Sequence, residues 1–144
     1  ANAIALSQVL KIVTDKRSKF VLKSGNLFKF FTDELQKLGG VINGSVDIDN
    51  KRVPTNISVS FPDVNHEFLQ MQLDAAGISC ATRSACLERG GEGSDVLDAL
   101  HQGAGIPITS NQALRFSFGY ETTQSELEIV VLEIKQCLQI QRSV

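Results

Sequence analysis

The chain has 144 residues, of which 42% are hydrophobic, and its 14 Lys and Arg against 16 Asp and Glu give a net charge of −2. This length fits one domain with a core of its own, and the slight acidic excess argues against a surface for nucleic acid or an anionic membrane. Three cysteines are too few for a disulfide framework and favour a reducing, cytoplasmic compartment, and no apolar run approaches the roughly 18 residues of a membrane span.

The first 38 residues are predicted to be helical, because their apolar side chains recur at spacings of three and four. These side chains form two stripes: Ile4, Leu6, Val9, Leu10 and Val13, followed by Leu27, Phe28, Phe31, Leu35 and Leu38. The polar run over 14–19 and the glycine at 25 leave two alternatives open, one long helix or two helices that meet near Gly25. Gly39 and Gly40 suit a helix end. The segment begins without an initiator Met or the basic start of a secretory signal, so we expect a processed, trimmed or excised chain.

After Gly40 the apolar period changes from that of a helix to that of a strand. Four short strands are predicted, at 41–44, 56–61, 78–82 and 113–118. Between them, helices are predicted over 65–76 and over about ten residues that begin near Ser94, a good N-cap.

The last helix has the clearest start. Thr123 and Glu126 have the spacing of a capping box, and an uninterrupted apolar stripe follows as far as Leu138. Interleaved helices and short strands predict an α/β (α+β) two-layer sandwich, in which a small mixed or antiparallel sheet of about four strands is covered on one face by helices. We expect a single domain, with residues 1–40 as a helical segment that packs on residues 41–144.

Cys86 is the first candidate for chemistry. It lies between Arg83 and Arg89, whose positive charges favour the reactive thiolate form. The glycines within 90–93 predict a mobile loop, which suits a nucleophile that picks up a group in one place and delivers it in another. A small residue on a surface loop with no role is the alternative, and the residues alone leave both open.

Arg115 is the second candidate. It alternates with Leu114 and Phe116, so its side chain is expected on the face opposite the apolar side of its strand. The planar guanidinium can bind a carboxylate through two parallel hydrogen bonds, and recognition of a carboxylate is therefore one interpretation. An exposed strand residue, or a partner in an internal ion pair, is the other.

The two remaining cysteines are predicted to be structural, and neither histidine stands out. Cys80 lies in a predicted strand and Cys137 in the apolar stripe of the last helix, where cysteine packs as a small hydrophobic residue. Neither His66 nor His101 stands at a ligand-like spacing from the cysteines, so no metal site is predicted.

Four segments together resemble the C-terminal small domain of NifS-like cysteine desulfurases, pyridoxal-phosphate enzymes of the class V aminotransferase family. In the order and spacing of that family, they are 53–61 (VPTNISVSF), 77–86 (GISCATRSAC), 95–100 (DVLDAL), and 113–119 (ALRFSFG) with Thr122 and Thr123. The similarity runs through most of the chain, and the four segments jointly carry far more weight than any one of them.

The resemblance implies a role for each candidate. Cys86 matches the cysteine that takes the sulfur of L-cysteine and becomes a persulfide, with L-alanine as the other product. Arg115 matches the arginine that holds the α-carboxylate of the substrate. The long loop after Cys86 resembles the branch of the family used in iron–sulfur cluster assembly, which implies a sulfur acceptor or iron–sulfur scaffold protein as a partner.

The chain departs from the family pattern in four places. Arg83 replaces a usual Gly, 90–93 is Gly-rich where the family has a more hydrophobic segment, and Tyr120 stands where Arg is common. In the family, the lysine that carries pyridoxal phosphate follows a histidine in a preceding domain, and neither histidine of this chain precedes a lysine. We therefore expect pyridoxal phosphate in the complete enzyme and none bound by this chain alone.

The predicted function is that of a C-terminal domain that supplies Cys86 and Arg115 for sulfur abstraction and is incomplete alone. Its expected partner is the missing pyridoxal-phosphate domain or a full-length homologue. Two alternatives stay open: a stand-alone sulfur carrier that another enzyme loads at Cys86, and a regulatory or structural partner of a full-length desulfurase.

Overall fold

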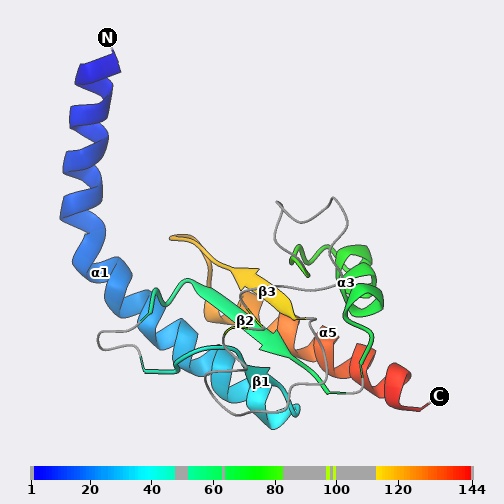
Figure 1. The fold of residues 1–144 in the computed structure, drawn as a ribbon. Helices are drawn as coiled ribbons and strands as arrows, with labels where there is room; N and C mark the ends of the chain where they lie inside the picture. The colour runs from blue at the N-terminus through cyan, green and yellow to red at the C-terminus, as the bar shows by residue number, and fades with distance from the viewer. Residues whose placement is uncertain are drawn as a thin grey trace.

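The structure, a computed structural model, describes residues 2–47, 52–62, 64–82, 97, 99 and 113–143. Its elements in chain order are α1 (Asn2–Lys37), β1 (Val41–Ile42), β2 (Asn56–Ser60), α3 (His66–Ala75), β3 (Leu114–Ser117) and α5 (Gln124–Arg142) (Figure 1). This is the predicted α+β arrangement with a long N-terminal helix. The helix predicted to begin near Ser94 lies outside the described residues, apart from Leu97 and Ala99. None of the described helices has the length and hydropathy needed to cross a membrane.

The first helix is continuous, which decides between the two alternatives for residues 1–38. α1 runs through Gly25, and a Cβ built at Gly25 would meet nothing within 4 Å. The helix ends at Gly39, whose φ of +84° is a left-handed conformation that favours glycine. The prediction of a helix end at this glycine pair is confirmed.

The three strands form one antiparallel sheet in the order β1-β2-β3. Val59 of β2 pairs with Ile42 on one side and with Leu114 on the other, which fixes the register across the sheet. About four strands were expected. The segment predicted as a strand at 78–82 contributes one bridge, from Ala81 to Arg115 on the other edge of β3.

One face of the sheet is apolar and covered by helices, as predicted. Ile57, Val59 and Leu114 are fully buried there, beside Phe116. The ring of Phe31 from α1 meets the ring of Phe116 edge to face, with 5.3 Å between their centroids. α5 lies against the same face (Figure 1), and α3 packs beside α5.

Only the second half of α1 takes part in this core. The buried residues of the helix are Ser24, Leu27, Phe28, Phe31, Thr32 and Leu35. The earlier apolar stripe is exposed: Leu6, Val9, Leu10 and Val13 keep 54–60% of their surface in solvent. This first half projects away from the sheet (Figure 1), and the buried residues of the helix all lie in its second half.

Both later helices begin with a side-chain cap. In α5 the Thr123 hydroxyl accepts from the Glu126 backbone N–H, and the Glu126 carboxylate accepts from the Thr123 backbone N–H, so the predicted capping box is confirmed. The Thr123 backbone N–H and hydroxyl both donate to the Glu126 carboxylate, and these two hydrogen bonds lower its pKa. At α3 the Asn65 side chain accepts from the Phe68 N–H.

Two glycine-to-alanine substitutions test the packing at the end of α1. A Cβ at Gly40 would lie 2.8 Å from the Leu35 carbonyl oxygen and 2.8 Å from Cγ2 of Val59. Because a backbone atom and a buried side chain must then move, we expect Gly40→Ala to lower the free energy of unfolding by about 2 kcal/mol. Gly25→Ala, in open space within the helix, should raise it by about 0.5–1 kcal/mol. Urea unfolding followed by circular dichroism measures both, and a Gly40→Ala variant as stable as the wild type would contradict the close approach.

Candidate functional site

Arg115 lies on the polar face of the sheet, as the alternation of β3 predicts. Its neighbours Leu114 and Phe116 are buried on the opposite face, whereas Arg115 is exposed. Within the described part of the chain, its guanidinium makes no hydrogen bond or ion pair. The Arg115 guanidinium is therefore exposed and has free hydrogen-bond donors. The interpretation of Arg115 as a partner in an internal ion pair finds no such pair among the described residues.

Small residues lie on both sides of Arg115 across the sheet. Ser58 of β2 is its register partner, and Ala81 pairs with it on the other edge. The Arg115 N–H donates to the Ala81 carbonyl at 2.7 Å, and the Ala81 N–H donates to the Arg115 carbonyl at 3.1 Å. The chain that leads to Cys86 therefore starts beside Arg115. Cys86 itself, like Arg83, Arg89 and the glycines of 90–93, lies outside the described residues.

Gln70 of α3 fixes the segment that carries Ala81. Its side-chain amide donates to the Cys80 carbonyl at 2.9 Å, and its amide oxygen accepts from the Thr82 hydroxyl at 2.9 Å. Both hydrogen bonds flank Ala81, so one side chain holds the segment on either side of its bridge to β3. Sequence reasoning missed this contact, because no local pattern marks a helical Gln as the partner of a segment ten residues further on.

The two described cysteines are poor nucleophiles. Burial, with a smaller contribution from the Asp74 carboxylate, raises the pKa of Cys80 to about 11. Burial also raises the pKa of Cys137, which packs in the core as predicted. Because the thiolate is the reactive form, a raised pKa makes both thiols less reactive than an ordinary cysteine.

His66 has a structural role that the sequence did not reveal. The ring is fully buried, and its Nε2 accepts the backbone N–H of Phe61 at 2.9 Å. This hydrogen bond ties the start of α3 to the end of β2. Within the described part of the chain, no three His, Cys, Asp or Glu side chains are grouped as a metal ion would require. His101 lies outside the described residues.

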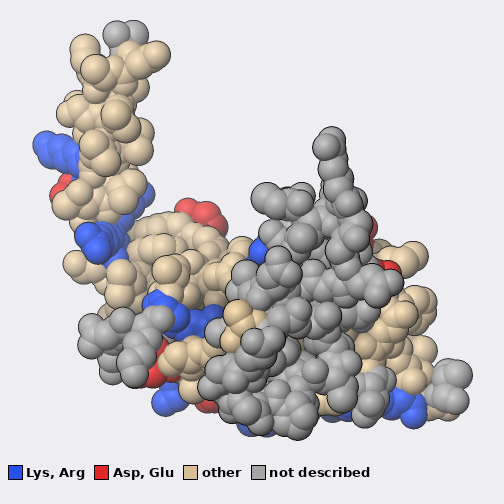
Figure 2. Space-filling model, viewed as in Figure 1, with Lys and Arg blue, Asp and Glu red and all other residues tan. Residues whose placement is uncertain are grey.

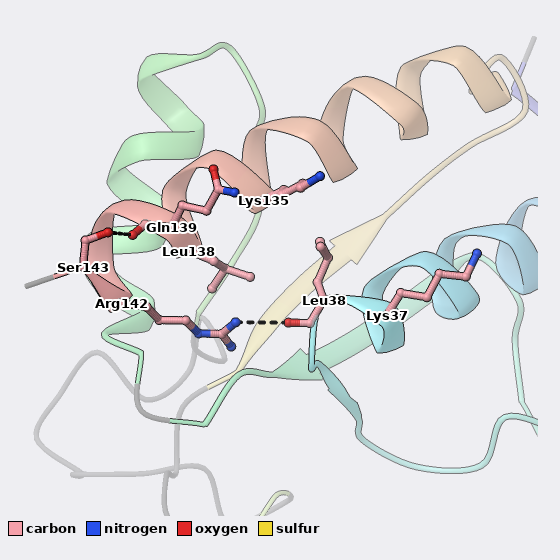
Figure 3. A pocket seen from close by; sticks show the side chains of 7 residues that line it. All are labelled: Lys37, Leu38, Lys135, Leu138, Gln139, Arg142 and Ser143. Atoms are coloured by element: carbon pink, nitrogen blue, oxygen red, sulfur yellow. Dashed lines mark hydrogen bonds between the residues drawn. The ribbon is translucent and has the colours of Figure 1, made fainter.

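A basic hollow of about 390 Å³ lies between the ends of α1 and α5 (Figure 3). Lys37, Lys135 and Arg142 line it, with Leu38 and Leu138 between them. Lys37 is paired with Glu34 at 2.5 Å, and Arg142 reaches the Leu38 carbonyl at 3.4 Å. Cations in the last turn of a helix interact favourably with its dipole, which accounts for Lys37 and Arg142 without a ligand.

Tyr120 ties the middle of α1 to the loop after β3. Its ring stacks on Phe20, with 5.5 Å between the centroids, and the ammonium groups of Lys16 and Lys23 lie 5.3 and 5.9 Å from the ring centre. Lys23 also donates to the Tyr120 carbonyl at 2.7 Å. Tyr120 was noted in the sequence as a departure from a family pattern, and in the structure it contacts the middle of α1.

Comparisons with known proteins agree in sequence and in fold. The cysteine desulfurase IscS of Dictyoglomus turgidum is 26% identical over 147 residues, which cover 100% of this chain and 36% of that protein. That of Vibrio atlanticus is 36% identical over 94 residues, 65% of this chain and 21% of the relative. A solved NifS-like protein has a TM-score of 0.73 at 23% identity, covering 92% of this chain and 32% of its own. The chain resembles a C-terminal part of cysteine desulfurases.

The resemblance predicted from the four segments is thus confirmed, although no family model matches the chain. The chain spans about a third of the length of the Dictyoglomus turgidum desulfurase and about a fifth of the Vibrio atlanticus one. The match is to one part of such an enzyme, and the activity of the whole remains a proposal for this chain.

The described lysines do not fit the pyridoxal phosphate of a desulfurase. A lysine that binds this cofactor covalently needs a desolvated amine with a lowered pKa. All described lysines are exposed except the half-buried Lys23, which donates to Tyr120, and the Glu34 carboxylate raises the pKa of Lys37. In the described part of the chain no lysine is placed to carry the cofactor.

Proposed function

We propose that this chain forms the C-terminal part of a cysteine desulfurase and is catalytically incomplete by itself. Arg115 binds the α-carboxylate of L-cysteine, and Cys86 receives its sulfur as a persulfide. The pairing of Ala81 with Arg115 is the observation that carries the proposal, because the segment that leads to the thiol starts next to the carboxylate-binding group.

The chain length between the two groups is compatible with this transfer. Cys86 follows Ala81 by five residues, which span at most about 18 Å when extended. This length is enough to bring the thiol to a ligand held at Arg115, and we propose that the same thiol then passes its sulfur to an acceptor. The transfer balances: L-cysteine and the Cys86 thiol give L-alanine and the Cys86 persulfide. A reducing compartment keeps the thiol free for this reaction.

The pKa values of the other thiols support Cys86 as the nucleophile. Burial raises the pKa of Cys80 and of Cys137, whereas Cys86 is flanked in sequence by Arg83 and Arg89. Neighbouring cations stabilise a thiolate.

The exposed half of α1 is the proposed contact with the cofactor-binding part of the enzyme. This half carries a stripe of apolar side chains, namely Leu6, Val9, Leu10 and Val13. The stripe lies on the same face of the helix as Leu27 and Phe31, which are buried in the core. The Dictyoglomus turgidum relative matches this helix within a protein nearly three times as long, so such a chain has further structure to place against it.

The charge of this half favours a different polypeptide over a second copy. Residues 11–23 carry five cations and one anion, a net charge of +4, and Figure 2 shows Lys and Arg on the flanks of the projecting helix. Two copies that paired along the stripe would bring these charges together. A different polypeptide whose contact surface is apolar with an acidic rim would complement this half of α1 better.

The sulfur transfer is tested by complementation. The chain is mixed with the cofactor-binding part of the Dictyoglomus turgidum desulfurase, pyridoxal phosphate and L-cysteine. We expect L-alanine and a persulfide on Cys86 with both parts present and neither product with this chain alone, because the cofactor is held by the other part. Mass spectrometry of the alkylated chain locates the sulfur.

Cys86→Ser is the matched variant, since it keeps Cys80 and Cys137. It should form no persulfide, and sulfur found equally on the variant would contradict the role of Cys86. A complete, active desulfurase that loads Cys86 in place of the cofactor-binding part would instead support the sulfur-carrier alternative.

The contact along α1 is tested by charge insertion. Leu10→Glu should weaken binding to the same cofactor-binding part by at least about tenfold, because it buries a carboxylate in an apolar contact. Calorimetric titration measures the change. Ile12→Glu is the control: Ile12 is 51% exposed and, two residues from Leu10, lies on the other side of the helix.

Equal weakening by both variants would contradict the stripe as the contact. Self-association of the wild-type chain that Leu10→Glu abolishes, seen by light scattering, would assign the stripe to a second copy.

A further inference from the structure

A row of four residues crosses the sheet at the level of Arg115. Asn43, just after β1, lies opposite Ser58, which pairs with Arg115, which in turn pairs with Ala81. The Asn43 N–H donates to the Ser58 carbonyl at 2.8 Å, so the backbone polar groups of Ser58 point toward β1. Those of Arg115 point the other way, toward Ala81. Ser58 and Arg115 are therefore a non-hydrogen-bonded pair, the arrangement that brings side chains closest, with Cα atoms about 4.5 Å apart.

The hydroxyl of Ser58 is held and keeps a proton to donate. Asn43 Nδ2 donates to Ser58 Oγ at 3.1 Å and to Ser60 Oγ at 3.0 Å. An amide nitrogen only donates, so the bond occupies a lone pair of Ser58 Oγ and leaves its O–H proton available. Asn43 is 7% exposed, so the amide that holds Ser58 is itself fixed.

The donors beside this row suit a carboxylate. The Arg115 guanidinium has no partner among the described residues, the half-buried Ser58 lies on one side of it, and Ala81 on the other side is too small to cover it. A carboxylate has two oxygens with several lone pairs, so it can accept hydrogen bonds from the guanidinium and a further one from the hydroxyl.

We propose that Ser58, positioned by Asn43, is a second donor to the amino-acid carboxylate that Arg115 binds. The inference rests on the proposed function, since it takes its ligand from there, and it adds a residue to that site. Ser58 sets the orientation of the carboxylate over the sheet, and Asn43 acts through Ser58.

The test is a titration of the whole chain with L-alanine, followed by NMR at the Arg115 Nε–H and at backbone amides. In the wild type, the chemical shift of the Arg115 Nε–H should change saturably with L-alanine. It should not change with L-alaninamide, which lacks the carboxylate. Ser58→Ala should raise the dissociation constant about tenfold, the effect of one hydrogen bond to a charged group. Ser58→Thr, which keeps the hydroxyl, should stay within about threefold of the wild type.

Ser117→Ala is the matched control. Ser117 lies on the same face two residues from Arg115, and its Oγ also accepts from an Asn amide, that of Asn56, at 3.0 Å. It should bind L-alanine like the wild type. Thermal unfolding of each variant separates loss of fold from loss of binding.

Saturable binding at Arg115 that Ser58→Ala leaves unchanged would overturn this inference and leave the role of Arg115 standing. No saturable shift at Arg115 in the wild type would overturn both.

Discussion

The fixed register between β2 and β3 is the constraint on which the site depends. Ile57 of β2 pairs with Phe116 of β3, and Val59 pairs with Leu114. All four side chains are buried in the core that α1 and α5 share with the sheet. A shift by one residue would turn this apolar set to solvent and put Arg115 in the core, so burial enforces the register. Because successive strand residues point to opposite faces, the same burial holds Arg115 and Ser58 on the polar side. The core thus positions the candidate site without touching it.

Much of this could be predicted from the sequence, because the signals are local. The alternation around Arg115 gave its face, the spacing of Thr123 and Glu126 gave the capping box, and Gly39 gave the end of α1. The resemblance to cysteine desulfurases also came from short segments in a fixed order. Strand and helix periods report which side of an element is apolar, and here they did so correctly.

The rest could not be predicted, because it depends on contacts between residues far apart in the chain. No periodic pattern in the sequence indicates the three contacts of this kind: the stack of Tyr120 on Phe20, the hydrogen bond from Gln70 to the Ala81 segment, and the hydrogen bond from Asn43 to Ser58. Nor could the period reveal that one apolar stripe of α1 is buried and the other exposed. Cys86 was found from its sequence neighbours, and its role is still a proposal because it lies outside the described residues.

The most direct test of this arrangement is the proton–proton nuclear Overhauser effect between strands β2 and β3. In a non-hydrogen-bonded antiparallel pair the two Hα atoms face each other at short range. We predict a strong cross-peak between the Hα of Ser58 and the Hα of Arg115, together with a slowly exchanging Arg115 amide. An Hα–Hα cross-peak from Arg115 to Ile57 or to Val59 in place of the one to Ser58 would mean a register shifted by one residue, which would put the guanidinium on the apolar face and contradict the site.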